Sequence, residues 1–443
     1  MRKAALHNLG CKVNSYETEA MQQMLEASGY EIVPFQEEAD VYLINTCSVT
    51  NMADRKSRQM IHRARKKNPR AVIVAAGCYV QTAHERGEQD DAIDIVIGNN
   101  KKHELIRLLD EYFAKEDITE QDHVNRKKTQ AVIDINHPGE SYEELHLERT
   151  AEHTRAFIKV QDGCNQFCTY CIIPYARGRV RSRKAEDVLQ EIQRLAKNGY
   201  REVVLTGIHL SSYGIDIGDN LLHLIEEVHG IEGIRRIRLG SLEPKIVTEE
   251  FVRRLSELPK ICPHFHLSLQ SGCDETLKRM NRKYTTEEYE EGCKILRKYF
   301  DHPAITTDVI VGFPGETEAE FQATKEYLER IHFYEMHIFK YSRREGTKAA
   351  AMQDQIPEQI KTERSNELLA LEQRMSREFR EDYLGKETEA LMEEKTIIDG
   401  VEYYVGFTKE YVKTAVLAGE DLTNRFVRGR IERALTEEIY LIS

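Results

Sequence analysis

Long apolar runs are missing from this sequence of 443 residues. No stretch approaches the roughly 18 apolar residues of a membrane-spanning helix, and the opening MRKAALHNLGCK lacks the apolar core of a secretory signal peptide. Solenoid-type repeats and low-complexity tracts are also missing. We therefore expect a soluble, cytoplasmic protein with no membrane partner, and its length suggests two to four domains of roughly 100 to 200 residues each.

A surplus of positive charge is missing as well. Lys and Arg number 63 against 75 Asp and Glu, so the formal net charge is −12. This average does not indicate a nucleic-acid-binding protein, but steering of a charged partner depends on where the charges cluster. Three stretches are locally basic: 55–67 (RKSRQMIHRARKK), 177–184 (RGRVRSRK) and 425–433 (RFVRGRIER). Each could contact phosphates, although a solvated face is the alternative for any single stretch.

Cysteine is present in an odd number, nine, which in a reducing compartment favours metal ligation or catalysis over a disulfide framework. The densest group is DGCNQFCTYC, which holds Cys164, Cys168 and Cys171 (the central trio) and has no fourth cysteine before Cys262. A structural zinc site and a ferredoxin-type electron carrier both need four ligands at short spacing. The pattern instead favours a [4Fe–4S] cluster with three cysteine ligands and one open iron.

Three further cysteines, Cys11, Cys47 and Cys78 (the N-terminal trio), each follow a strand-like run in the first hundred residues. Apolar runs alternate there with amphipathic stretches, which predicts an α/β domain with an open parallel sheet. Because the loops after parallel strands share one edge of the sheet, the three cysteines could converge. The alternative is that each one is a small buried apolar residue.

Six strand-like runs, each of the first five followed by a helix-like segment, occupy the middle of the chain, and Gly199 is expected to end the first helix. Six units are two short of a closed eight-unit barrel, so we expect a partial (βα)6 barrel. A charged helix at 357–380 and a small all-β barrel of about 60 residues follow. The predicted domains are 1–115, a polar linker at 116–149, 150–378 and 379–443.

The CxxxCxxC loop on a partial barrel resembles the radical S-adenosylmethionine (radical SAM) enzymes over roughly residues 150 to 350. The resemblance implies that the open iron chelates S-adenosyl-L-methionine and that one electron from the cluster cleaves it to a 5′-deoxyadenosyl radical. Segments similar to those with which the family holds this cofactor are LTG, HLSLQSG and VIVGFPGE. The candidate cofactor residues are Tyr170, Thr206, Gly207, Ser268, Gln270, Gly312, Gly315 and Glu316. For Tyr170 a packing role is the alternative to stacking on adenine.

With NLGCKVNSYETE, NTCSVTNMADRKSRQ and AAGCYVQ included, nearly the whole chain resembles the methylthiotransferase branch of radical SAM enzymes. The resemblance implies a second [4Fe–4S] cluster on the N-terminal trio and a C-terminal TRAM domain that binds RNA, for which we single out Arg425, Arg428 and Arg430. We expect an external electron donor, because the chain has no GxGxxG fingerprint of a flavin or nicotinamide site. A sulfur source is a further expected partner.

Three segments resemble the branch that acts on N6-threonylcarbamoyladenosine in tRNA, beside the anticodon: GCKVNSYETEAM, LTGIHLSSYG and SLQSGCDETLKRMNRKYT. We therefore expect methylthiolation at carbon 2 of that nucleoside, whose hydrogen no side-chain base can remove. An anticodon-loop base is single-stranded and enters a pocket at low cost. The alternatives are methylthiolation of N6-isopentenyladenosine and a non-enzymatic RNA-binding iron–sulfur protein. Cys262, Cys273 and Cys293 are expected to be packing residues.

Overall fold

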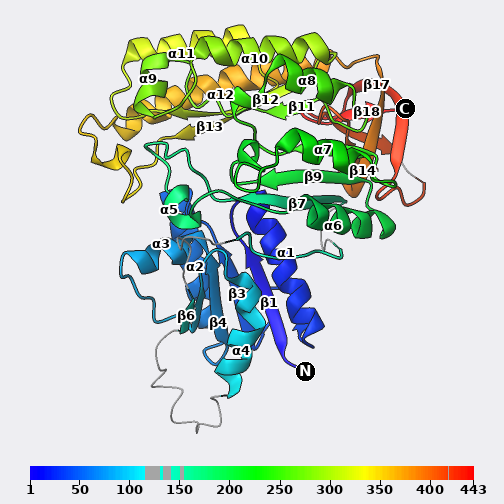
Figure 1. Ribbon diagram of the computed structural model, residues 1–443. Helices are drawn as coiled ribbons and strands as arrows, with labels where there is room; N and C mark the ends of the chain where they lie inside the picture. The colour runs from blue at the N-terminus through cyan, green and yellow to red at the C-terminus, as the bar shows by residue number, and fades with distance from the viewer. Residues whose placement is uncertain (115–129, 133–140, 150–153, 418) are drawn as a thin grey trace.

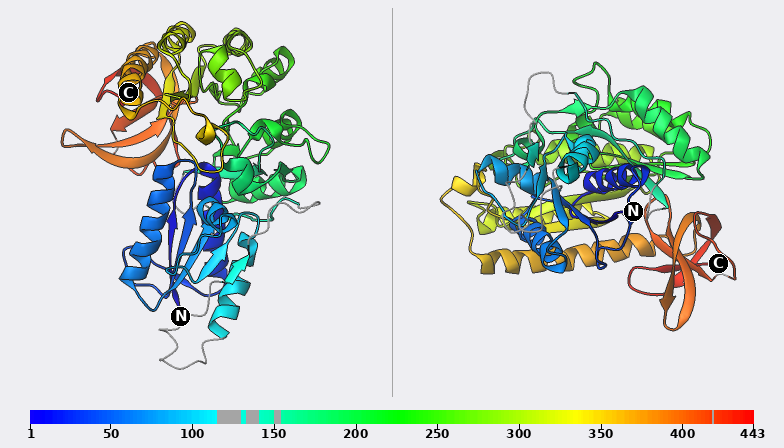
Figure 2. Two further views of the ribbon diagram at one scale, coloured as in Figure 1. Left: turned by 90° about the vertical axis from the view of Figure 1, so that its left-hand side faces the viewer. Right: turned by 90° about the horizontal axis from the view of Figure 1, so that it is seen from below.

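The computed structural model describes residues 1–114, 130–132, 141–149, 154–417 and 419–443. Most of the predicted linker and the predicted start of the central domain at residue 150 therefore lie outside the described residues. Figures 1 and 2 show an N-terminal sheet region on one side of a central region, with a C-terminal barrel at the end of a long helix. Within the described part of the chain, no helix combines the length and the apolar character needed to cross a membrane.

The N-terminal region is a parallel six-stranded sheet of order β2-β1-β3-β4-β5-β6. Every residue of β3 and β4 is buried, as expected for parallel strands covered on both faces. The strands are β1 Lys3–Asn8, β2 Glu31–Ile32, β3 Val41–Thr46, β4 Val72–Gly77, β5 Ile95–Ile97 and β6 Gln130–Val132. The helices are α1 Lys12–Ala27, α2 Asn51–Lys67, α3 Cys78–Glu85, η1 Lys102–Glu104 and α4 Leu105–Ala114.

Parts of the predicted linker are built into this region. Strand β6 pairs with β5, and Tyr142, Leu145 and Leu147 are buried. Leu145 and Leu147 pack in one cluster with Tyr16 of α1. These short apolar stretches are surrounded by charged residues, so they show no periodicity by which the sequence alone would reveal them.

The central region consists of two sheets, β10-β9-β7-β8 and β11-β12-β13, in which every pair is parallel except β7–β8. Isolated parallel bridges at Ile237↔Ile261 and Leu242↔Leu267 connect the two sheets. The strands are β7 Arg155–Asp162, β8 Arg181–Ser182, β9 Glu202–Gly207, β10 Arg236–Leu239, β11 His264–His266, β12 Ala304–Val311 and β13 Glu335–Lys340. The predicted mixed α/β class with parallel sheets is confirmed.

Helices cover the apolar face of these sheets and bury the largest hydrophobic cluster of the described chain. Gly199, the predicted helix stop, follows α6 with φ +94°, and Thr285 and Thr317 begin α10 and α11 with capping boxes. The helices are α5 Ile173–Arg177, α6 Ala185–Lys197, η3 Leu210–Ser212, α7 Leu221–His229, η4 Pro244–Ile246, α8 Glu249–Ser256, α9 Asp274–Arg279, α10 Thr286–Tyr299, α11 Glu318–Ile331, η5 Ala349–Ala351 and α12 Glu358–Glu381.

The C-terminal region is an all-β closed barrel of order β14-β15-β16-β18-β17, and closure leaves no sheet edge exposed. It packs on the end of α12, where Phe379 and Tyr383 join the barrel's cluster. Arg236 and Arg238 of β10 donate to barrel carbonyls, for example from Arg238 Nη2 to Thr408 O at 2.6 Å. The strands are β14 Glu387–Ile398, β15 Val401–Phe407, β16 Lys413–Leu417, β17 Phe426–Ala434 and β18 Tyr440–Ile442.

Candidate functional site

The central trio lies on a tight loop between β7 and α5. The loop starts at Gly163, whose φ is +71° and where an added Cβ would lie 1.8 Å from Arg179 O, so only glycine fits. Within the loop, Cys171 N donates to Cys168 O at 3.0 Å. The Asn281 side chain donates to Phe167 O at 2.9 Å. The loop is therefore held compact by its own backbone and by the segment after α9.

The surroundings of these thiols suit a cluster. Arg282 Nη1 donates to Cys168 Sγ at 3.3 Å, which supplies a positive charge beside a group of three ligands. Burial, with Cys168 adding to the effect in both cases, raises the pKa of Cys164 to about 11 and that of Cys171 to about 12. Metal binding must therefore displace protons from both thiols, and the arginine offsets the negative charge that results.

The N-terminal trio follows three neighbouring parallel strands. Cys11 comes after β1, Cys47 after β3 and Cys78 after β4, and these strands are adjacent in the order β1-β3-β4. An added Cβ at Gly10 would lie 2.9 Å from Cys47 Sγ, so the first two loops touch. Burial and then the neighbouring Cys78 raise the pKa of Cys47 to about 11. The loops after the strands thus bring the three cysteines together, as predicted from the strand pattern.

The spacing of the sulfurs argues against a single metal ion in either trio. A tetrahedral zinc, with Zn–S bonds of about 2.3 Å, holds its sulfurs only about 3.8 Å apart. Among the described residues, neither trio has all three sulfurs within 4.8 Å of one another. Neither trio therefore offers the close grouping of three sulfurs that a single zinc ion would need.

The segment after the central trio packs against the N-terminal trio across the boundary between the sheet regions. Helix α5, which follows the central cysteines, packs against α3, which begins at Cys78. Arg177 Nε of α5 donates to Cys78 Sγ at 3.2 Å, and Asn99 Nδ2 donates to Ala176 O at 2.7 Å. A second contact joins the same regions where Arg344 Nη1 pairs with Asp54 Oδ2 at 2.8 Å.

The inner face of the central sheet, opposite its helices, is polar. Thr206, Ser268 and Gln270 of the predicted cofactor set belong to this face by the alternation of strand side chains. Gln270 has φ +74°, and its backbone is bridged to Val309 of β12. Three further side chains, one on each strand of the β11-β12-β13 sheet, lie on this face and were not predicted from the sequence: His266, Asp308 and His337.

These three side chains form a cluster in which all ligand atoms lie within 4.8 Å of one another. His266 Nε2 lies 3.2 Å from Asp308 Oδ2, and the imidazoles of His266 and His337 stack at 5.6 Å. Alternation of polar and apolar residues along HFHLSLQ and ITTDVIVG was the signal that could have revealed this face.

Other predicted cofactor residues are engaged by the protein itself. Glu316 Oε2 accepts from Gly312 N at 2.7 Å and from Arg364 Nη1 at 2.6 Å, so this carboxylate closes a turn. An added Cβ at Gly207 would lie 2.8 Å from the Gln161 side chain, and one at Gly315 would lie 3.4 Å from Arg279 Nε. Close packing therefore explains Gly207, and the left-handed backbone, with φ +77°, explains Gly315.

Tyr170 packs in an apolar cluster with Met280, Phe313 and Tyr341, and its ring meets the Phe313 ring edge-on at 6.4 Å. The packing role is thus visible, and stacking on adenine stays a prediction. Cys262 and Cys293 are buried, Cys293 within the main hydrophobic cluster, and Cys273 precedes α9 as its N-cap.

The prediction of a basic surface at 177–184 is wrong for three of its arginines. Arg177, Arg181 and Arg183 are buried, and Arg183 pairs with Glu191. The run of arginines is visible in the sequence, but the acidic residues that pair with them are distant in the chain. The sequence alone therefore predicted a surface that is solvated or faces RNA.

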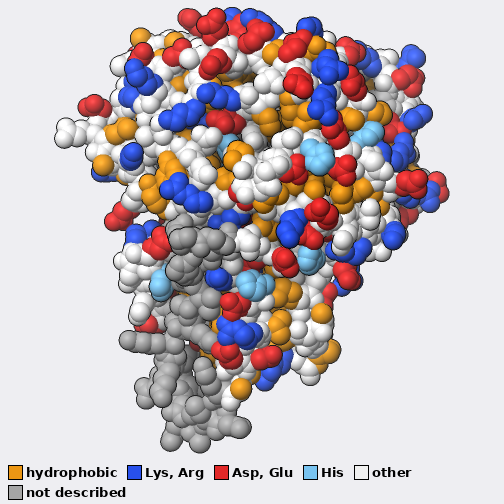
Figure 3. All heavy atoms as spheres, viewed as in Figure 1, with side chains coloured by type: hydrophobic (Ala, Val, Ile, Leu, Met, Phe, Trp, Pro, Cys, Tyr) orange, Lys and Arg blue, Asp and Glu red, His pale blue; other side chains and the backbone are white. Residues whose placement is uncertain are grey.

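The C-terminal arginines are exposed, as RNA contacts would require. Each also lies near a glutamate: Arg425 near Glu420, Arg428 near Glu389 and Arg430 near Glu387. Figure 3 shows Lys and Arg intermingled with Asp and Glu over the face that it draws.

Comparison with known proteins gives the class. Residues 158–328 match the Radical SAM superfamily, and residues 3–98 match the uncharacterized protein family UPF0004. Among solved structures, the radical S-adenosylmethionine methyltransferase TsrM of Kitasatospora setae shares the fold, with a TM-score of 0.57 at 15% identity over 79% of this chain and 74% of that chain. The fold and the cysteine loop define a radical SAM protein, a class that implies one [4Fe–4S] cluster and S-adenosyl-L-methionine.

The full-length relatives are more specific. The threonylcarbamoyladenosine tRNA methylthiotransferase MtaB of Bacillus subtilis (strain 168) is 41% identical over 98% of this chain and 94% of its own length. MtaB of Aquifex aeolicus (strain VF5) is 43% identical over 93% of this chain and 97% of its own length. The tRNA-2-methylthio-N(6)-dimethylallyladenosine synthase of Moorella thermoacetica is 37% identical over 96% of this chain and 95% of its own length. The chain belongs to the radical SAM methylthiotransferase family.

Proposed function

We propose that this protein methylthiolates carbon 2 of N6-threonylcarbamoyladenosine beside the anticodon of tRNA, giving 2-methylthio-N6-threonylcarbamoyladenosine. The observation that carries the proposal is the contact of Arg177, which follows the central trio, with Cys78 of the N-terminal trio, in a chain whose relatives include two MtaB proteins. A carbon–hydrogen bond of a purine ring offers no acidic proton to a side-chain base, which is why a radical cofactor suits this substrate.

Two [4Fe–4S] clusters are part of the proposal, one on the central trio and one on the N-terminal trio. Cys164, Cys168 and Cys171 would hold the central cluster, which together with S-adenosyl-L-methionine would supply the radical chemistry. The chain's own side chains hold and orient these groups: Arg282 donates to Cys168, and Arg177 donates to Cys78. An electron donor and a sulfur source must come from outside the chain.

We assign the cofactor pocket to the polar inner face of the central sheet, with Thr206, Ser268 and Gln270 in it. Gly207, Gly312, Gly315 and Glu316 would then shape the turns around the pocket, because their close contacts are with protein groups.

The domain plan 1–115, 116–149, 150–378 and 379–443 belongs to this proposal, with the central strands as a partial (βα)6 barrel and the last five strands as a TRAM domain. The change from α12 to β14, between Glu381 and Glu387, supports the last boundary. In this plan Arg425, Arg428 and Arg430 contact tRNA phosphates, and action on tRNA makes the cytoplasm the compartment.

A strain that lacks the gene tests the substrate. Mass spectrometry of its tRNA nucleosides should show loss of 2-methylthio-N6-threonylcarbamoyladenosine and accumulation of the unmethylthiolated nucleoside. The second candidate, favoured by the Moorella thermoacetica relative, is the dimethylallyl (isopentenyl) adenosine reaction, and loss of that product instead would establish it. Purified reduced enzyme that makes no 5′-deoxyadenosine from S-adenosyl-L-methionine would point to a non-enzymatic RNA-binding protein.

A further inference from the structure

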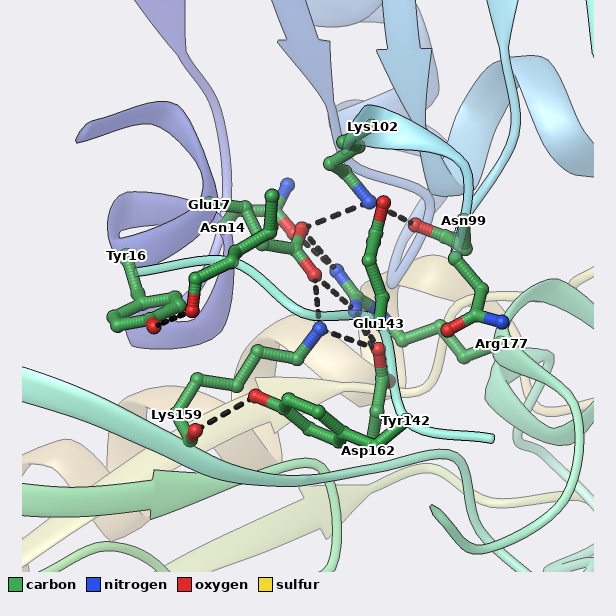
Figure 4. A network of polar contacts seen from close by, with 12 residues as sticks. Asn14, Tyr16, Glu17, Asn99, Lys102, Tyr142, Glu143, Lys159, Asp162 and Arg177 are labelled. Carbon is green, nitrogen blue, oxygen red and sulfur yellow. Dashed lines mark hydrogen bonds and ion pairs between the residues drawn. The ribbon is translucent and has the colours of Figure 1, made fainter. Parts of the chain in front are cut away.

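A fully buried network of charges joins the N-terminal and central regions (Figure 4). Its members, which we call the interdomain charge network, are Glu17 of α1, Lys102 of η1, Lys159 and Asp162 of β7, and Arg177 of α5. Their side chains are 0 to 1% exposed. Charges taken out of water at this depth are costly unless they are paired and hydrogen-bonded, so the arrangement requires a specific reason.

Arg177 is the centre of the network and uses all five of its N–H donors. Nη1 donates to Glu17 Oε1 at 2.9 Å and to Asp162 Oδ1 at 3.1 Å. Nη2 donates to Asn14 Oδ1 at 2.6 Å and to Glu17 Oε2 at 3.1 Å. Nε donates to Cys78 Sγ at 3.2 Å. Arg177, at the end of the helix after the central trio, thus donates a hydrogen bond to a cysteine of the N-terminal trio.

The lysines complete the carboxylate pairing. Lys159 Nζ lies 2.7 Å from Glu17 and 2.6 Å from Asp162, and Lys102 Nζ lies 3.1 Å from Glu17 and donates to Asn99 Oδ1 at 3.0 Å. Asn99 in turn directs its Nδ2 toward Cys78 Sγ at 3.6 Å.

The network holds three cations, Lys102, Lys159 and Arg177, and only two carboxylates, so one positive charge is left over. More distant charged groups are Arg181, 3.9 Å from Asp162, and Glu143, which pairs with His103. The Arg177 guanidinium faces Cys78 Sγ, where a metal-bound sulfur would carry negative charge.

We propose that Arg177 is a positioning residue for the N-terminal cluster: its hydrogen bond and positive charge hold Cys78 Sγ in place and raise the reduction potential of the cluster. The inference rests on the proposed second cluster. Hydrogen bonds and positive charge at a cluster sulfur stabilise the reduced, more negative state, so their loss lowers the potential. A residue that only joined two domains would not have this effect.

The test uses full-length protein in which Cys164, Cys168 and Cys171 are all replaced by Ala, so that only the N-terminal cluster can form. Its midpoint potential is measured by a redox titration followed by electron paramagnetic resonance, with and without Arg177→Met and Arg177→Lys. We expect a shift to lower potential for Arg177→Met and a smaller shift for Arg177→Lys, which keeps the charge but loses the forked donor set.

The matched control is Arg344→Met. Arg344 is another buried arginine that crosses the same boundary, and it pairs with Asp54 and Ser48 without donating to a sulfur. Its loss should leave the potential unchanged. Equal shifts in both variants, or no shift in Arg177→Met, would overturn the positioning role. If the triple Ala protein binds no iron, the proposed second cluster itself is wrong.

A second measurement covers the case in which Arg177→Met folds poorly. Thermal unfolding is compared for iron-free and anaerobically reconstituted protein, for wild type and variant. Because Arg177 donates to Cys78 Sγ and Met cannot, iron bound at this sulfur should raise the melting temperature of wild type more than that of Arg177→Met. An equal rise in both proteins contradicts the inference.

Discussion

Arg282 donates a hydrogen bond to the sulfur of Cys168, just as Arg177 does to the sulfur of Cys78. In each cysteine trio one arginine donates to a sulfur, at 3.3 Å in the central trio and at 3.2 Å in the N-terminal one. Arg282 also donates to Ser268 O at 3.2 Å and to the Tyr284 hydroxyl at 2.9 Å, so it connects the cysteine loop to the inner face of the sheet.

Replacing Arg282 by Met should therefore lower 5′-deoxyadenosine formation by about 10- to 100-fold, the usual cost of losing a partner of a metal ligand. The rate is measured per bound iron, so that cluster loss and cluster mispositioning are separated. Lys283→Met is the control, because Lys283 is the exposed neighbour and its amine meets only Asn281 Oδ1 in the described contacts. A normal rate in Arg282→Met would remove this arginine from the site.

Iron content tests the ligand assignment directly. Anaerobically reconstituted protein should carry about eight irons, and both Cys78→Ala and Cys168→Ala should retain about four. Of these two variants, only Cys78→Ala should still make 5′-deoxyadenosine, because its central trio is intact. Cys262→Ser and Cys293→Ser should keep about eight irons, since these cysteines lie away from both trios in packed surroundings. About four irons in the wild type would contradict the two-cluster assignment.

Much of the site could be predicted from local sequence. Short strands end just before Cys11, Cys47 and Cys78, and the parallel pattern predicts that their loops share one edge. The six central strands are likewise visible as apolar runs between amphipathic stretches. Such features depend on residues within about one strand–helix unit of each other, which is the distance over which periodicity carries information.

The burial of Arg177 could not be predicted in the same way. Its partners Glu17 and Asn14 come from α1, 160 and 163 residues away, and no spacing rule relates them. In sequence the residue belongs to a basic run, and only the packing of two domains turns it into the centre of a buried network. The same reasoning applies to residues 141–149, whose buried tyrosine and leucines were taken for part of a polar linker.

The C-terminal arginines should contribute a salt-dependent part of tRNA affinity. Reversing Arg425, Arg428 and Arg430 to Glu should weaken binding and reduce the slope of log affinity against log salt by up to about 0.9 per lost phosphate contact. The nearby Glu420, Glu389 and Glu387 reduce the local positive charge, so the loss should be below that limit. Binding is measured by a salt titration with unmodified tRNA.

The matched control for this reversal is Lys294, Lys298 and Arg330. These exposed cations of α10 and α11 are also paired with glutamates, but they lie on the helices of the central region. Reversal there should leave the slope unchanged. An unchanged slope in the C-terminal variant as well would exclude the barrel from RNA binding.

His103 should make a small pH-dependent contribution to stability. A hydrogen bond from its Nδ1 to Glu143 Oε1, at 3.1 Å, raises the pKa of His103 above its usual value. A raised histidine pKa stabilises the fold fully below the unfolded value near 6.5, and this stabilisation is lost as the pH rises through the folded value. The half-exposed ring limits the effect to less than about 1 kcal/mol.

The measurement is the difference in unfolding free energy between wild type and His103→Gln at pH 5.5 and at pH 8.5. The difference should be larger at pH 5.5, because only the protonated imidazole forms an ion pair with Glu143. A difference that does not change with pH would show that the pair contributes no charge interaction.

Gly312 shows how a glycine expected to face a cofactor can be required by the protein itself. Its φ is +68°, and an added Cβ would lie 2.3 Å from Lys361 Cγ of α12. Gly312→Ala should therefore destabilise the protein by more than the roughly 1–2 kcal/mol that a left-handed backbone costs, since the lysine stem must also move. Lys361 is held in place because its Nζ donates to Tyr341 O at 3.1 Å.

A double-mutant cycle separates the two roles of this glycine. In Lys361→Ala the crowded Cγ is gone, so adding Gly312→Ala should cost only the backbone strain, and the two substitutions should couple by about 0.5–3 kcal/mol in chemical unfolding. If the glycine instead serves only the approach of S-adenosyl-L-methionine, the free energies will add. The affinity for the cofactor will then fall equally in both backgrounds. Coupling in stability, with cofactor affinity restored in the double variant, would identify α12 as the element that dictates glycine at this turn.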